Sequence, residues 1–132
     1  MSKWTKEKTN SWYEKQEWLV GCNFLPSTAI NQLEMFQDDT FDLETIKTEI
    51  SWASDLGFNS LRIYLHDLLW ENKKSFTTKL DKLLDICSAE NIKPILVLFD
   101  DCHRPYPKLG TQPKPVRGCL LYTSPSPRDL YQ

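Results

Sequence analysis

The stretch "GFNSLRIYL", residues 57–65, has a counterpart 34 positions further along the chain in "NIKPILVLF", residues 91–99. Each stretch opens with polar residues and continues as an apolar run of strand length. Each also follows a segment with helical spacing of apolar residues, and the separation is close to the length of one βαβ unit. Near-continuous apolar strands are typical of parallel sheets covered by helices, so the sequence predicts an α/β fold.

The rest of the chain fits repeated β-loop-α units. The run "EWLVGCNFL", residues 17–25, predicts a buried first strand, and residues 26–40 predict a polar loop. A helix should then begin with Asp42 as its N-cap and end at Gly57. Its apolar stripe comprises Leu43, Ile46, Ile50, Ala53 and Leu56. After an expected loop at residues 66–74, a second helix should bury Phe76, Leu80, Leu83, Leu84 and Cys87.

The composition excludes several classes of function. The chain has 132 residues, of which 40% are hydrophobic and 12% aromatic, which indicates one globular domain. Its 16 basic and 18 acidic residues give a net charge of −2, so we expect neither a nucleic-acid partner nor a membrane partner. The first residues carry no secretory signal, and a cytoplasmic location follows unless a signal preceded Met1. The four cysteines match neither a zinc site nor a disulfide framework.

Polar and aromatic residues gather directly after the three predicted strands. Ligands of α/β proteins bind beyond the carboxyl ends of the strands, which here means residues 23–37, 66–70 and 100–106. Their mixture of carboxylates, amides, imidazoles and aromatic rings suits a sugar, whose hydroxyls need acceptors and whose C–H face stacks on rings. A dinucleotide would need a glycine-rich first turn, and only Gly21 is present there. We therefore expect a carbohydrate ligand and no cofactor.

Three blocks of sequence resemble the first three βα units of a cellulase-like glycoside hydrolase, from the clan of (β/α)8 barrels. They are "WLVGCNFLPSTAINQLEMFQ", "DLGFNSLRIYLHDLLWE" and "NIKPILVLFDDC", and the resemblance spans about residues 12–115. It implies a retaining β-glycosidase that acts on β-linked polysaccharide or oligosaccharide, such as glucan, mannan or xylan. Two glutamates would serve as acid/base and nucleophile, about 5 to 5.5 Å apart.

The same resemblance indicates a truncated TIM barrel. In that clan the acid/base glutamate follows an asparagine after the fourth strand, and the nucleophile ends the seventh. A whole barrel needs roughly 250 residues, and this chain reaches only its third strand. We therefore expect residues 1–118 to be the N-terminal part of a hydrolase, inactive alone and without a catalytic residue. The alternative is a complete, flavodoxin-like α/β binding module with no hydrolase activity.

Four candidate substrate-binding residues have individual interpretations. An arginine within an apolar strand needs a charged partner, which we expect Arg62 to have. The resemblance implies that this partner is the nucleophile glutamate, with Arg62 lying beneath it and keeping it ionised. A surface arginine on an edge strand is the alternative. By the same resemblance, Asn23 contributes polar contacts at the end of the first strand. His66 is suited either to bind a hydroxyl or to cap a loop, and Trp70 either to stack on a sugar or to pack.

The carboxylates after the strands complete the candidate set. We expect Glu34, Asp67, Asp100 and Asp101 to bind sugar hydroxyls or to fix loops. Asp100 and Asp101 are unsuited to be a catalytic dyad, because consecutive residues of a strand point to opposite faces. His103 is the last candidate. Its neighbourhood supplies too few further ligands at metal spacing, so no metal is expected.

The last part of the chain is unlike the rest. Residues 119–129, "CLLYTSPSPRD", show neither strand alternation nor helical spacing. They resemble the translation of a transposase-end sequencing adapter over eleven consecutive codons. We therefore divide the chain into residues 1–118, the protein proper, and residues 119–132, a non-native tail that is excluded from fold reasoning.

Overall fold

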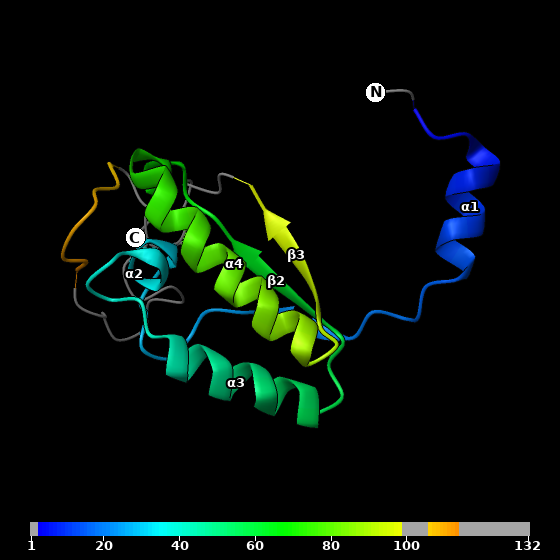
Figure 1. Cartoon of the computed structure of the whole chain (residues 1–132), viewed down its shortest axis with the longest axis horizontal. Helices are drawn as coiled ribbons and strands as arrows, with labels where there is room; N and C mark the ends of the chain where they lie inside the picture. The colour runs from blue at the N-terminus through cyan, green and yellow to red at the C-terminus, as the bar shows by residue number, and fades with distance from the viewer. Residues whose placement is uncertain (1–2, 99–105, 114–132) are drawn as a thin grey trace, which may run out of the picture.

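The computed structural model of the chain describes residues 3–98 and 106–113. One or two helices separate successive strands along the described residues, and Figure 1 shows helices lying over a small sheet. The elements are α1 (Lys6–Glu14), β1 (Gly21–Asn23), α2 (Gln32–Phe36), α3 (Leu43–Asp55), β2 (Ser60–Tyr64), the 3-10 helix η1 (Asp67–Asn72), α4 (Lys73–Ala89) and β3 (Lys93–Val97). The predicted α/β class is confirmed.

The three strands form one parallel sheet in the order β1-β2-β3, so β2 is the central strand. Each strand pairs with the next strand along the chain. The register places Asn23 beside Arg62, and Arg62 beside Ile95. Because neighbours in register point to the same face of a sheet, these three side chains share one face.

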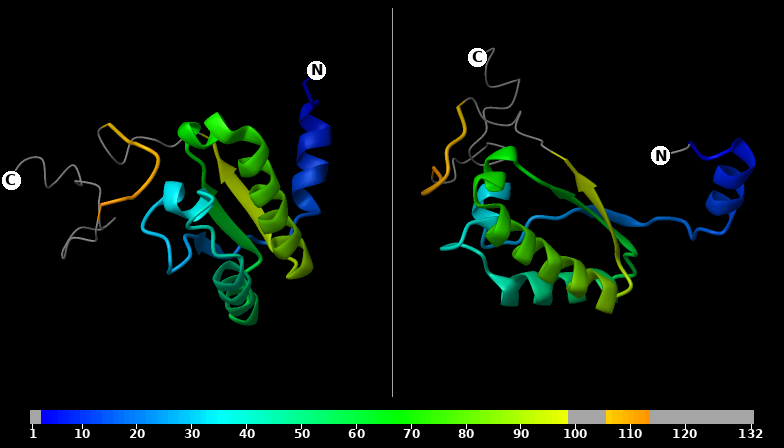
Figure 2. Two further views of the ribbon diagram at one scale, coloured as in Figure 1. Left: turned by 60° about the vertical axis from the view of Figure 1, so that its left-hand side comes forward. Right: turned by 45° about the horizontal axis from the view of Figure 1, so that its top comes forward.

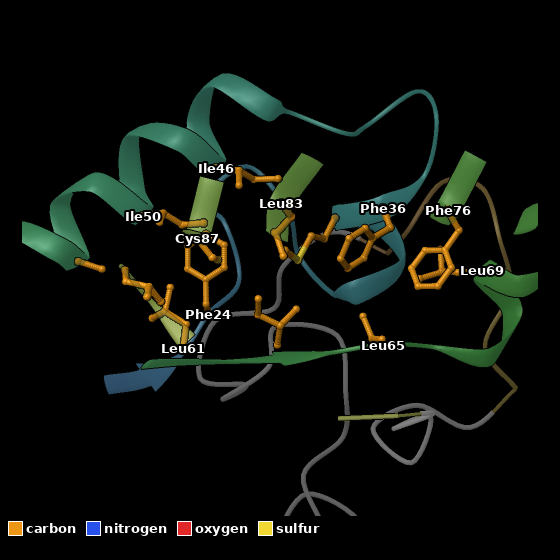
Figure 3. Close-up of a cluster of buried hydrophobic side chains, with 14 of the residues drawn as sticks. Phe24, Phe36, Ile46, Ile50, Leu61, Leu65, Leu69, Phe76, Leu83 and Cys87 are labelled. Atoms are coloured by element: carbon orange, nitrogen blue, oxygen red, sulfur yellow. The ribbon is translucent and has the colours of Figure 1, made fainter. Parts of the chain in front are cut away.

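One face of the sheet is covered by α3 and α4 (Figures 1 and 2). Leu61 and Ile63 of β2, and Leu65 directly after it, point to this side and are at most 3% exposed. Figure 3 shows Leu61 and Leu65 facing side chains from α2, α3, η1 and α4. The principal partners are Phe36, Ile46, Ile50, Leu69, Phe76, Leu83 and Cys87. Burying each large apolar side chain stabilises the fold by roughly 1.5 to 3 kcal/mol.

Helix α3 follows its sequence prediction from start to stop. The Asp42 side chain caps it, because the backbone N–H of Thr45 donates to Asp42 Oδ1 at 3.0 Å and the Thr45 hydroxyl donates to Asp42 Oδ2 at 2.6 Å. These bonds lower the pKa of Asp42. Gly57 takes a φ of 85° just beyond the helix end, a backbone conformation that favours glycine. Leu56 was expected in the apolar stripe but is 75% exposed.

The prediction of a buried first strand over residues 17–25 is wrong. The strand β1 covers only Gly21–Asn23, and all three residues are exposed. The described residues cover only one face of the sheet, and β1 lies at its edge, so an apolar sequence here does not become buried. Trp18 is 82% exposed for the same reason. Phe24, which directly follows the last residue of β1, enters the core.

Two short elements were missed in segments predicted to be loops, and a third lies where no element was predicted. Residues 26–40 contain α2, which buries Leu33, Met35 and Phe36 and has Asn31 as its N-cap. The helix has five residues, too few to show a helical period. Residues 66–74 contain η1, and α1 precedes the first strand without burying any residue. In the described ranges, no helix combines the length and apolar character needed to cross a bilayer.

Candidate functional site

The face of the sheet opposite α3 and α4 carries the sequence candidates Asn23 and Arg62. Residues of this face alternate along β2 with the buried leucines and isoleucine, because side chains of a strand point to the two faces in turn. Arg62 is exposed, and so are its two register neighbours, Asn23 and Ile95. The two faces of the sheet therefore differ in polarity: one is apolar and covered by helices, and the other bears an arginine. We refer to this second surface as the open face.

A hydrogen bond joins the two candidates on the open face. Arg62 Nε donates to Asn23 Oδ1 at 2.8 Å, across neighbouring strands. The guanidinium carbon also lies 5.1 Å from the centroid of the Tyr64 ring, two residues along the same face. A guanidinium that is bonded at one edge and stacked on a ring is held in a defined orientation. This arrangement can receive a carboxylate or a sugar hydroxyl.

Both earlier interpretations of Arg62 need correction in part. It lies on the central strand, not on an edge strand, and it is exposed, not buried. Within residues 3–98 and 106–113, no carboxylate forms an ion pair with it. Its partner there is the neutral amide of Asn23. Exposure on the open face removes the desolvation cost that would have demanded a charged partner.

A shallow hollow of about 250 Å³ lies on the open face beside the pair, lined in part by Leu19, Asn23, Arg62 and Ile95. Gly21 forms part of its floor. A Cβ atom built on Gly21 would lie 1.7 Å from the carbonyl oxygen of Ser60, so the backbone of β1 approaches β2 too closely for any side chain. Only glycine therefore fits at this position while β1 stays paired with β2 in this register.

The candidates after β2 lie in and around η1 and have local roles. His66 is buried, and its Nδ1 accepts a hydrogen bond from the Leu68 N–H at 3.2 Å. The structure therefore shows it capping η1, one of its two expected uses. The same Leu68 N–H also donates to Asp67 Oδ1 at 2.8 Å, and the Asp67 side chain is 55% exposed. His66 and Asp67 lie just beyond the carboxyl end of β2, as expected.

Trp70 combines packing with exposure. One edge of its ring meets Phe76 at a centroid distance of 6.2 Å, and the Lys73 ammonium lies 4.9 Å from its centroid. The residue nevertheless remains 48% exposed. Both expected uses, packing and stacking on a sugar, are compatible with this geometry.

Glu34 fixes a loop in the structure. Its Oε2 accepts from the Ile30 N–H at 2.7 Å, while its own N–H donates to Asn31 Oδ1 at 3.0 Å, so it completes the cap of α2. The remaining candidates, Asp100, Asp101 and His103, lie outside the described residues. In the part of the chain that is described, no group of three or more His, Cys, Asp or Glu residues could hold a metal ion.

Sequence reasoning missed one polar cluster, formed by Asp38, Asn72, Ser75 and Lys79. The Lys79 ammonium donates to Asp38 and, at 2.5 Å, to the Ser75 hydroxyl. The bond from Lys79 lowers the pKa of Asp38 most, followed by the bond from Ser75. The cluster borders a cavity of about 260 Å³ between α2, η1 and α4. Its one sequence signal was a lysine within the apolar stripe of α4, between Phe76 and Leu83.

With this geometry established, the chain was compared with known proteins. No family model, curated protein or solved structure matches it significantly.

Proposed function

We propose that the chain is the N-terminal part of a retaining glycoside hydrolase with a (β/α)8 barrel, acting on β-linked polysaccharide or oligosaccharide. Its three strands would be the first three strands of the barrel, and the open face would line the interior of the barrel. Asn23 and Arg62 would lie near the sugar and the catalytic carboxylates. The glutamates that perform the reaction would come from later strands.

The order of the strands supports this proposal. A (β/α)8 barrel places each strand beside the next one in the chain, as in β1-β2-β3. A flavodoxin-like sheet, the alternative, has its second strand on the outside in the order 2-1-3. The helices α3 and α4 lie together on one face of the sheet, as the outer helices of a barrel do (Figure 2).

The observation that carries the proposal is the hydrogen bond between Arg62 and Asn23 on the open face. A polar pair held in register on two strands is expensive if that face is later filled by apolar packing, so the face suits a site that binds a polar or charged group. An arginine orients a carboxylate through paired N–H donors and favours its ionised form. A nucleophilic glutamate needs both effects.

The proposal is tested with protein expressed from the uninterrupted gene. We expect that longer protein to hydrolyse β-glucan or β-mannan with retention of anomeric configuration, and residues 1–132 alone to show no turnover. Arg62→Lys in the longer protein keeps the charge but loses the planar fork, and should lower kcat by about 10²-fold. Lys47→Arg, a change at an exposed position on α3 away from the open face, is the control. Hydrolysis by residues 1–132 would refute the placement of the catalytic pair.

A further inference from the structure

The cavity beside the Lys79 cluster lies where the segments that follow the three strands meet, and its volume is about 260 Å³. Its walls come from the end of α2 and the turn after it, from η1 and the start of α4, and from residues that follow β3. Phe36, Leu69 and Phe76 of the hydrophobic core form its floor, so it lies on the helix-covered side of the sheet, apart from the open face. Ligands of α/β proteins bind among such segments beyond the strands.

One wall of the cavity is a sequence-distant segment that is fastened to the end of α2 (Figure 1, orange). Gln37 Nε2 donates to the Gly110 carbonyl at 3.1 Å, and the Gly110 N–H donates to Gln37 Oε1 at 2.7 Å. Asn31 Nδ2 donates to Gln112 Oε1 at 2.8 Å, and Gln112 is only 6% exposed. These bonds hold Leu109 and Gly110 in place, so the wall is preformed, as is usual for small-molecule sites.

Three charged side chains line the cavity, and two of them neutralise each other. The Lys79 ammonium donates to the Asp38 carboxylate. The carboxylate of Asp39, the next residue, makes no hydrogen bond or ion pair within residues 3–98 and 106–113. The turn that carries it is ordered, because the Phe41 N–H donates to the Gln37 carbonyl at 2.9 Å. The cavity therefore presents one unpaired negative charge on a fixed backbone.

The apolar floor and the unpaired carboxylate together define the ligand. The rings of Phe36 and Phe76 meet edge to face with their centroids 5.3 Å apart (Figure 3). An apolar cavity of about 150 Å³ holds benzene, so a cavity of about 260 Å³ holds roughly ten non-hydrogen atoms. An ammonium group is attracted both by a carboxylate and by aromatic rings, whereas an anion is repelled by Asp39.

We propose that this cavity binds a small organic cation, a primary amine with an aryl or alkyl body. The ammonium group would donate to the carboxylate of Asp39, and the body would pack on Phe36, Phe76 and Leu109. The inference goes beyond the proposed function and does not depend on it, because no residue that lines this cavity lines the hollow on the open face.

The test is a titration of residues 1–132 with phenethylamine. Saturation-transfer difference spectra of the amine give the affinity at low protein concentration, and amide correlation spectra of the protein give the location. We expect a Kd of about 0.1 to 1 mM, with shifts at the amides of Asp39, Asn72 and Gly110. Phenethyl alcohol, which has the same ring without the charge, should bind about fivefold more weakly, and phenylacetate should not compete.

Asp39→Asn should weaken binding of the amine by about the same fivefold. The matched control is Asp55→Asn, which removes an exposed carboxylate at the end of α3, outside the cavity, and should leave the Kd unchanged. The comparison of amine with alcohol needs no variant, so the proposal stays testable if a substitution disturbs the fold.

Four results would overturn the assignment. They are a response to phenethylamine that does not saturate, equal affinity for the amine and the alcohol, equal losses in the two aspartate variants, and binding of phenylacetate in preference to the amine. The last of these would show that Asp38 does not neutralise Lys79. Saturable binding that depends on both the charge of the ligand and Asp39 would support the assignment, whether or not protein from the uninterrupted gene hydrolyses glycans.

Discussion

The two faces of the sheet predict losses of stability of different size for the same substitution at Ile63 and at Ile95. Both are isoleucines, and they lie on adjacent parallel strands, one residue apart in register. Ile63 points to the helices and is 0% exposed, whereas Ile95 points to the open face and is 47% exposed. Replacing each by alanine removes the same atoms and the same β-branched strand preference, so that the difference between the variants reports burial.

The magnitudes follow from that burial. Truncating a fully buried isoleucine to alanine costs about 2 to 5 kcal/mol through lost transfer energy and the cavity left behind. Complete burial of such a side chain contributes about 1.5 to 3 kcal/mol, so half-exposed Ile95 should lose roughly 1 kcal/mol. We therefore expect Ile63→Ala to lower the free energy of unfolding by at least about 1 kcal/mol more than Ile95→Ala.

Equilibrium urea denaturation of residues 1–132, followed by far-ultraviolet circular dichroism, measures this difference. The slope against urea should be the same in all proteins, so that midpoints compare directly. Measurements at two protein concentrations detect self-association, which would cover the open face and make the midpoint depend on concentration. Equal losses in the two variants at low concentration would refute the assignment of the two faces.

The strands and long helices could be predicted because their signals are local. Helix α3 has a capping aspartate, an apolar stripe and a terminal glycine within one segment, and all three act in the structure. The bounds of β2 and β3 fall inside the predicted apolar runs for a similar reason. What failed was the burial of the first strand. An apolar sequence does not reveal that only one face of its sheet is covered.

The candidate site was predicted in outline and not in its contacts. The residue types at the strand ends singled out Asn23 and His66, and its position within an apolar strand singled out Arg62. The bond between Asn23 and Arg62, 39 positions apart, depends on register, which a single sequence does not specify. His66 was assigned two uses because an imidazole serves both, and the local bond to Leu68 appears only in three dimensions. The cluster around Lys79 was missed because a lysine on an apolar helical face is usually an interruption of that face.

Three further predictions concern single positions. Gly21→Ala should separate β1 from β2, because its Cβ would meet the Ser60 carbonyl; we expect a loss of about 1 to 3 kcal/mol and faster hydrogen exchange over residues 18–26. Because Lys79 lowers the pKa of Asp38, the Asp38 carboxylate stabilises the fold above its unfolded pKa, near 3.8, and this contribution is lost as the pH falls further. Asp38→Asn should therefore reduce the fall of the urea midpoint with decreasing pH, the acid limb, measured between pH 6 and pH 2. Burial raises the pKa of the Cys87 thiol to about 11, so alkylation at pH 8 should require unfolding, as peptide mass spectrometry can show.

Each of these predictions has a control within the chain. Gly57→Ala changes a glycine with open space around it and should leave exchange over residues 18–26 unchanged, although its positive φ still costs stability. Asp39→Asn alters the exposed neighbour of Asp38, and an equal effect of the two substitutions on the acid limb would contradict the role of Lys79. Cys22 is exposed and should be alkylated in the folded protein, so equal rates at Cys22 and Cys87 would show that α4 is not packed as described.

The most direct test of the proposed hydrolase is the nucleotide sequence of the uninterrupted gene beyond the codon for Arg117. The proposal predicts a helix-forming segment, then a fourth apolar strand that ends in Asn-Glu, and further βα units to roughly 250 residues or more. It also predicts a second glutamate at the end of the seventh strand. A stop codon directly after Arg117, or a fourth strand without that glutamate, would contradict the assignment to this clan of glycoside hydrolases.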